Sequence, residues 1–259
     1  MNPIDLVTPG ILGLGFVLVF FVLMIAFVVA GRRRAHRAQP LAGLRSIPAF
    51  DRLVQAVGLA VEAGQRLHLS LGRGSLSGLQ AASALVSLSV LDRIARDASV
   101  SDRPPVATSG EGALAILSQD VLRGTYRNMG IEDRFDPVSG QLTGLTAFSY
   151  AAGTLPIIFD QQVSANFIAG HFGAEVALIH DAAERSGGQT LAGSDNIPAQ
   201  AVIYALAQEP LIGEELYAAG AYTLAGPLHV ASLRAQDILR WVLILAILAG
   251  VVLKLVGAL

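Results

Sequence analysis

Two long runs of hydrophobic residues lie near the two ends of the 259-residue chain. Residues 11–30, ILGLGFVLVFFVLMIAFVVA, contain no charged side chain, and the run from Trp241 to Leu259 contains only Lys254. A helix needs about 20 apolar residues to cross the hydrocarbon core of a bilayer. The pattern therefore predicts two transmembrane helices with the rest of the chain between them.

Basic residues flank both runs on the sides that face the middle of the chain, namely Arg32, Arg33 and Arg34 after the first and Arg234 and Arg240 before the second. A cleaved signal peptide places its basic residues before a shorter apolar core, so we interpret the first run as an uncleaved anchor. Basic residues beside a span stay on the cytoplasmic side. We therefore expect a cytoplasmic middle domain with both termini outside.

This topology divides the chain into an anchor with a basic collar (1–37), an α/β domain (38–233) and a C-terminal span (234–259). Trp241 opens the second apolar run, and Lys254 is the only lysine of the chain. A charge within a span is costly and often functional. Lys254 lies five residues from the end, so its side chain either snorkels to the outer interface or takes part in a pore or an interhelical contact.

Between the two runs, short hydrophobic segments alternate with longer segments of helical periodicity. After a helix over Ala49–Gln65, the pattern predicts four strand–helix pairs and a final helix. The pairs are Leu67–Leu71 with Ser75–Ala98, Pro105–Ser109 with Glu111–Asn128, Ala165–Ala169 with Ala174–Ser186, and Gln189–Ala192 with Ile197–Gln208; the last helix is Ile212–Ala221. Such alternation indicates an α/β fold with a mainly parallel, Rossmann-like sheet of about four to six strands and flanking helices, inserted between the two spans.

The segment from Gly130 to Ser164 fits this repeat less well. Leu142–Tyr150 is a strand candidate, and residues 155–159 suit either a short helix or another strand. We therefore expect this segment to depart from the pattern.

Each predicted strand ends in a glycine-containing turn, and in a doubly wound fold these turns meet at the carboxyl edge of the sheet, where ligands bind. Free N–H groups at helix starts suit anions there. The candidate ligand-binding residues are Arg73, Gly74, Ser75, Ser77, Ser109, Gly110, Gly170, His171 and Ser194. The alternative is that the glycines only turn the chain and that Ser75 and Ser77 cap a helix. Acidic residues near the helix starts, Glu111, Glu175 and Asp195, compete with an anionic ligand.

The distribution of charge along the chain limits the classes of partner that it can bind. Residues 39–233 carry 18 Asp and Glu against 11 Arg, a net charge of −7, while basic residues gather beside the apolar runs. An acidic domain argues against nucleic acid, which requires a positive surface. The basic residues of the collar either contact anionic lipid or serve only as the signal that sets membrane topology. The chain has no cysteine, which excludes disulfides and thiolate metal sites.

Motifs for catalysis and cofactors are missing. The stretch 72–78, GRGSLSG, has its third glycine one position too late for the dinucleotide fingerprint, and no P-loop or G-x-S-x-G elbow occurs. His171 and Glu175 would share a helix face only if a helix began that early, so no metal site is predicted. His68, in the middle of a strand, is interpreted as a satisfied buried histidine. These observations weigh against an enzyme, and no cofactor is expected.

The stretches PLIGEELYAAGAY (210–222) and HVASLRAQDILRW (229–241) resemble a family of uncharacterised bacterial membrane proteins defined only by a domain of unknown function. The resemblance covers most of the chain and includes both apolar runs. It implies a prokaryotic membrane-anchored protein, which places the chain in the bacterial inner membrane. The resemblance implies no activity and identifies no site residues.

Helices rich in Ala, Ser and Gly, such as AASALVSLSVL, bury less apolar area per residue and favour support from neighbours. We therefore expect a non-enzymatic, membrane-anchored domain that self-assembles as a scaffold or as an accessory subunit of a membrane complex. Its expected partners are the lipid bilayer, further copies of the chain and other subunits of that complex. The alternative is a membrane-tethered sensor that binds a nucleotide or another anionic small molecule at the glycine turns.

Overall fold

The computed structural model describes residues 3–34, 44–101, 103–223 and 226–256. The chain forms two compact units, one made of residues 46–225 and the other of residues 1–45 with 226–259. Residues 35–43, which include the end of the predicted basic collar and the start of the predicted α/β domain, lie outside the described residues, as do the last three residues of the second apolar run.

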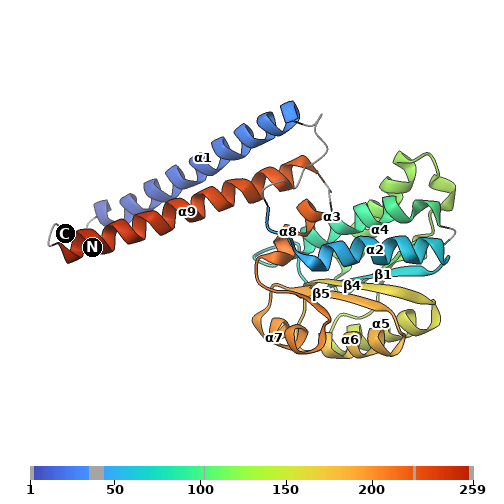
Figure 1. Cartoon of the computed structure of the whole chain (residues 1–259). Coiled ribbons are helices and arrows are strands. Elements are labelled where there is room, and N and C mark those ends of the chain that lie inside the picture. The colour runs from blue at the N-terminus through green and yellow to red at the C-terminus, as the bar shows by residue number, and fades with distance from the viewer. Residues whose placement is uncertain (1–2, 35–43, 102, 224–225, 257–259) are drawn as a thin grey trace. The chain divides into compact units, whose positions relative to one another are not determined.

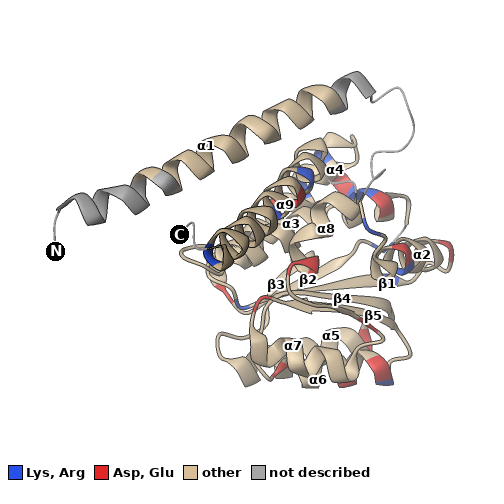
Figure 2. Cartoon of the chain, turned by 60° about the vertical axis from the view of Figure 1, so that its left-hand side comes forward, with Lys and Arg blue, Asp and Glu red and all other residues tan. Residues whose placement is uncertain are grey.

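Two long helices, α1 (Pro3–Arg34) and α9 (Pro227–Leu255), form the smaller unit and contact each other. Both are long and apolar enough to cross a membrane. The helix α9 begins with a proline, whose fixed φ suits the first helical turn, and it includes 14 residues before Trp241. Figure 2 marks acidic and basic residues along the larger unit and α9, whereas residues 11–30 of α1 include none.

Six parallel strands form the sheet of the larger unit, in the order β3-β2-β1-β4-β5-β6. The chain builds one half of the sheet outward from β1, then returns to the centre and builds the other half outward from β4. This confirms the predicted α/β class and shows that the sheet is wholly parallel. The strands are β1 (Arg66–Gly72), β2 (Val106–Ser109), β3 (Gly140–Leu142), β4 (Val163–His171), β5 (Gln189–Ser194) and β6 (Glu209–Leu211).

Helices cover both faces of this sheet, as a parallel sheet requires. Figure 1 shows one layer on each side. The first comprises α2 (Pro48–Glu62), α3 (Ala81–Asp97), α4 (Gly112–Asn128) and α8 (Glu215–Tyr222); the second comprises α5 (Ala147–Asp160), α6 (Val176–Arg185) and α7 (Ile197–Leu206). Short 3-10 turns occur at Ala98–Val100, Glu132–Arg134 and Pro137–Ser139.

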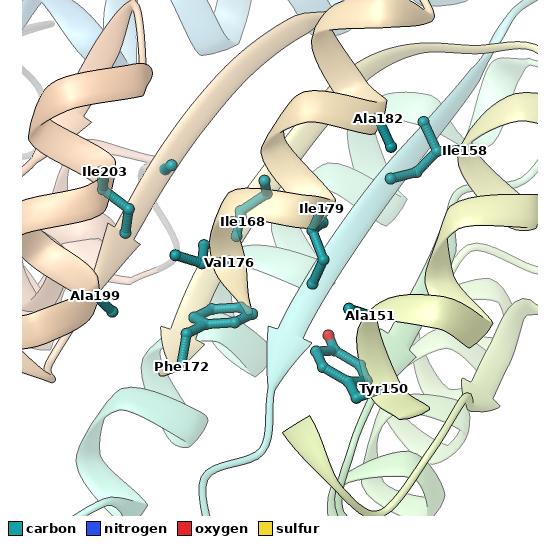
Figure 3. Packing of buried hydrophobic residues seen from close by; sticks show 11 residues of the cluster. Tyr150, Ala151, Ile158, Ile168, Phe172, Val176, Ile179, Ala182, Ala199 and Ile203 are labelled. Atoms are coloured by element: carbon teal, nitrogen blue, oxygen red, sulfur yellow. The ribbon is translucent and has the colours of Figure 1, made fainter. Parts of the chain in front are cut away.

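A hydrophobic core lies between the sheet and the second helix layer. Tyr150 and Ile158 from α5 pack here with Ile168 from β4, Phe172 from the loop after it and Ile179 from α6 (Figure 3). All five side chains are fully buried. Alanines fill many of the remaining positions, which lets the helices approach the sheet closely. The central strands β1 and β4 are buried along almost their whole length.

The segment from Gly130 to Ser164 continues the strand–helix repeat, so the expectation that it departs from the pattern is wrong. The predicted strand Leu142–Tyr150 is also wrong, because β3 ends at Leu142 and α5 begins at Ala147. A capping box starts this helix: Thr146 Oγ1 accepts from the Ser149 N–H, and Ser149 Oγ accepts from the Thr146 N–H. Residues 155–159 lie within α5, which contains Pro156.

The largest shift of a boundary is at the start of α3, and one strand, β6, is absent from the prediction. The helix α3 begins at Ala81 and not at Ser75, so residues 73–80 form a loop. The strand β6 was not predicted, because it has only three residues and includes Pro210. A proline is tolerated there because β6 is an edge strand, where a missing N–H need not break a ladder hydrogen bond.

Candidate functional site at the carboxyl edge of the sheet

The order in which strands are added to the sheet reverses between β1 and β4, at the centre of the sheet. In doubly wound sheets, ligands bind outside the carboxyl ends of the strands at such a point. The predicted candidates follow this edge: Arg73, Gly74, Ser75 and Ser77 come after β1, Ser109 and Gly110 close β2, Gly170 and His171 close β4, and Ser194 closes β5. The fold therefore brings the glycine turns to one edge.

Backbone contact between β1 and β4 explains two of the glycines. Gly72 has φ +74°, and a Cβ there would lie 2.5 Å from the carbonyl oxygen of His171. Gly170 has φ +148°, and a Cβ there would collide with the carbonyl oxygen of Leu71. The N–H of Arg73 donates to the His171 carbonyl at 2.9 Å, which joins the two strand ends. Both glycines are thus required by chain geometry.

Arg73, the basic residue expected to attract an anion, is paired with a buried carboxylate. Its Nε donates to Glu175 Oε1 at 3.0 Å, and its side chain passes over Gly110, where a Cβ would collide with it. Burial alone would raise the pKa of Glu175, but the N–H groups of Gly173 and Glu175 and the Arg73 guanidinium outweigh it and hold that pKa below its usual value. The charge of Arg73 is therefore already balanced within the chain.

The loop over residues 73–80 is held by its own side chains. Ser75 Oγ and Ser77 Oγ lie 2.9 Å apart, and the Ser77 N–H donates to Ser75 Oγ at 3.2 Å. The Ser75 N–H donates to the side chain of Gln80, the residue before α3. Since α3 begins at Ala81, the prediction that Ser75 and Ser77 cap this helix is wrong, and the N–H groups of Gly74 to Ser77 do not form a helix start.

A histidine–aspartate pair lies beside this loop. His171 Nδ1 and Asp195 Oδ1 are 2.7 Å apart, and Asp195 Oδ2 accepts from Ser83 Oγ at 2.7 Å. His171 Nε2 lies 3.2 Å from Gln80 Nε2. A carboxylate that orients an imidazole in this way supports proton transfer at the other ring nitrogen. His171 ends β4, so it does not share a helix face with Glu175.

The other polar residues singled out in the sequence make hydrogen bonds to main-chain atoms of nearby loops and helix starts. Glu111 caps α4, because its Oε2 accepts from the Leu114 N–H at 2.7 Å. Ser194 Oγ accepts from the N–H groups of Phe172 and Asn196. Ser109 Oγ donates to main-chain carbonyls. Carboxylates of the chain itself thus occupy positions at this edge that would suit an anionic ligand. Among the described residues, no three His, Asp or Glu side chains are placed to hold a metal ion.

Buried polar side chains form a row across the central strands, on the face of the sheet that α5 covers. Tyr150 Oη lies 2.6 Å from Ser70 Oγ and accepts from the Gly72 N–H at 3.2 Å. Next along the row, His68 Nε2 lies 2.9 Å from Thr108 Oγ1, and its Nδ1 lies 2.9 Å from Asn166 Oδ1. Burial lowers the pKa of His68 to about 4. His68 is thus a buried, doubly hydrogen-bonded histidine, as interpreted from its place in a strand.

These features define a doubly wound, wholly parallel α/β domain with a polar carboxyl edge, in a chain that also carries two long apolar helices. The chain belongs to the family described as Domain of unknown function (DUF6754), whose model matches residues 12–259. The predicted resemblance to a family defined by a domain of unknown function is thereby confirmed. No curated protein matches the chain, and no solved structure does.

The pairing of Arg73 with Glu175 gives a first testable prediction. Glu175→Gln is expected to lower the free energy of unfolding of the α/β domain by roughly 1–3 kcal/mol, because it removes a buried charge that accepts several hydrogen bonds. Amide hydrogen exchange of β1 and β4 in the full chain measures this loss.

The control is Asp97→Asn, which breaks the exposed Arg93–Asp97 pair on α3. Exposed pairs of this kind contribute at most about 1 kcal/mol. Equal effects of the two substitutions would show that the Arg73–Glu175 pair adds no stability beyond that of a surface pair.

Proposed function

We propose that this protein is a non-enzymatic scaffold, anchored in the membrane by α1 and α9, whose α/β domain self-assembles. The arginines beside the two apolar helices support a bacterial inner-membrane protein with a cytoplasmic domain and outward termini. The strand order, with β1 and β4 at the centre, supports a Rossmann-like assignment for the domain.

The helix α7 carries this proposal. Its sequence, IPAQAVIYAL, contains no charged residue, yet only Ala199 and Ile203 are buried. Ile197 is 79% exposed and Tyr204 is 74% exposed. A helix that is apolar on all sides is normally enclosed by protein or lipid. The exposed side of α7 therefore has the composition of an interface.

A second apolar surface lies at the other edge of the sheet. Leu142 at the end of β3, Leu145 in the next loop and Phe148 at the start of α5 are all exposed, Phe148 by 73%. The helix α7 packs on β5 and β6, whereas β3 forms the opposite edge. Two unlike surfaces on opposite edges suit a head-to-tail contact between copies.

The sensor alternative has less support. An unbalanced positive charge would favour an anionic ligand, but Arg73 is paired with Glu175. Glu111 and Asp195 add negative charge at the same edge. The His171–Asp195 pair is the feature that would favour a ligand there, and it suits a proton donor or acceptor more than a phosphate.

The mass of the full chain in mild detergent, measured by light scattering, tests the scaffold. We expect a particle larger than a monomer, and we expect Tyr204→Glu on α7 to reduce its size, because a charge then enters the apolar interface. The matched control is Ile116→Glu, at an exposed apolar position of α4 in the other helix layer. A monomeric wild type, or an equal effect of Ile116→Glu, would contradict the proposal.

A further inference from the structure

Two neighbouring arginines at the amino edge of the sheet, opposite the site described above, are bonded to glutamines and not to carboxylates. Arg66 is the first residue of β1, and Arg103 lies in the loop before β2. Arg66 Nη1 donates to Gln161 Oε1 at 2.5 Å, and Arg103 Nη1 donates to Gln162 Oε1. Both acceptors are neutral, and in the described part of the chain neither guanidinium forms an ion pair.

The positive charge of this pair is not balanced locally. Asp136 is the acid that acts on Arg66, but its Oδ1 accepts from the Val138 N–H at 2.9 Å. Burial and the charge of Arg103 lower the pKa of Arg66 more than Asp136 raises it. Two like charges held close together favour an anion beside them. Six other arginines of the domain each lie within 3.0 Å of a carboxylate, namely Arg52, Arg73, Arg93, Arg96, Arg123 and Arg185.

The residue that holds Arg103 has a strained backbone. Gln162 has φ +55°, in the left-handed region that residues other than glycine seldom adopt. It is the second residue after the end of α5, and at the same position Gly64 follows α2, Gly130 follows α4 and Gly187 follows α6. A glycine would relieve the strain but would lose the side chain that binds Arg103. Strain of this kind is concentrated at functional sites.

Gln162 also holds the other arginine, because its carbonyl oxygen accepts from the Arg66 N–H at 3.3 Å. One strained residue thus connects both arginine segments. Arg134 brings a third positive charge to this edge, since it and Arg66 both oppose the rise in pKa that burial causes in Tyr126. Arg103 is exposed and Arg66 is half-buried, so a molecule in solution can reach them.

The chemistry of the two side chains selects the ligand class. A guanidinium group binds the oxygens of phosphate and carboxylate through parallel hydrogen bonds. A phosphate monoester carries about two negative charges near pH 7 and offers three terminal oxygens. It therefore matches the charge of two arginines, whereas a single carboxylate matches one.

We propose that Arg66 and Arg103 bind the phosphate group of a phosphomonoester at the amino edge of the sheet, with Gln162 positioning both arginines. The same chemistry occurs in soluble phosphomonoesters and in the headgroup of phosphatidic acid, so the experiment below separates these two sources. The proposal does not depend on self-assembly, and either proposal can fail without the other.

The test follows the thermal midpoint of the full chain at constant ionic strength. One arm uses mild detergent with inorganic phosphate or glycerol 3-phosphate, and acetate as the control anion. The other arm uses lipid nanodiscs of phosphatidylcholine with or without phosphatidic acid. We expect a saturable rise, because a ligand that binds only the folded state stabilises it. A response to the soluble probes assigns a soluble phosphomonoester, and a response confined to phosphatidic acid assigns a lipid headgroup.

Two variants connect the response to the site. Arg103→Gln removes one charge from an exposed loop, so it should fold and should weaken binding by about tenfold or more. Gln162→Gly removes the strain together with the side chain that holds Arg103. It should keep or raise the midpoint measured without probe and should still weaken binding, which a merely structural residue would not do.

The matched control is Arg185→Gln, which removes an equal charge from an exposed arginine of α6 that pairs with Asp181. This variant is expected to keep the full response. The absence of a saturable rise in both arms would overturn the proposal and would leave the two arginines as counter-charges for the helix ends at this edge. A response that Arg103→Gln leaves unchanged, or that Arg185→Gln weakens equally, would overturn it as well.

Discussion

Gly72→Ala is expected to destabilise the α/β domain by about 3–5 kcal/mol, since it adds a left-handed backbone penalty and a collision that the packed strands cannot relieve. The glycine has φ +74°, and the new Cβ would lie 2.5 Å from the main-chain oxygen of His171. That oxygen also accepts the N–H of Arg73, so moving it breaks the contact between β1 and β4. Hydrogen exchange of β1 and β4 amides measures the effect.

Gly130→Ala is the matched control. Gly130 has the same φ of +74°, but no atom lies within 4 Å of the Cβ position. Only the conformational penalty of about 1–2 kcal/mol applies there. If both variants lost equal stability, the collision at the strand ends would contribute nothing, and Gly72 would be an ordinary turn glycine.

Acidification is expected to cost the domain about 3 kcal/mol through His68 alone, since each unit of pKa difference corresponds to about 1.4 kcal/mol. The pKa of His68 is lowered from 6.5 to about 4 by burial. The unfolded chain therefore binds a proton at this residue near pH 6.5, whereas the folded chain binds it only near pH 4. This contribution is fully present above pH 6.5 and is lost as the pH falls towards 4.

The variant His68→Gln isolates this effect, because it replaces the imidazole by an amide that can still bond to Asn166 but does not titrate. Its free energy of unfolding should fall less steeply between pH 6.5 and 4 than that of the wild type. Parallel curves for wild type and His68→Gln would show that His68 is not held neutral by the fold.

Local signals explain why most elements were predictable. Buried parallel strands are short apolar runs, and here glycine turns follow them, so β1, β2, β4 and β5 stand out in the sequence. The helix α5 was missed although Thr146 and Ser149 form a local capping box, because the dense apolar run at residues 155–159 resembles a strand. The start of α3 carries no such sign, since no side chain caps it.

The partners within the candidate site were not predictable from one sequence. Arg73 and Glu175 are 102 positions apart, and Ser83 and Asp195 are 112 positions apart. Their contacts depend on strand order and register, which set which turns face each other. The glycine turns in the sequence indicated that the candidate site lies at the carboxyl edge of the sheet. The neutralisation of Arg73 by Glu175 follows only from the packing of α6 against the centre of the sheet.

The insertion of the α/β domain between α1 and α9 limits the symmetry of any assembly in a bilayer. Under the topology proposed above, every copy of the chain inserts α1 and α9 in the same direction. Two-fold axes lying in the membrane plane are then forbidden, and dihedral arrangements with them. Closed assemblies must be cyclic, with their axis along the membrane normal. The proposed self-assembly therefore predicts polar rings and no back-to-back double layers in images of the extracted protein.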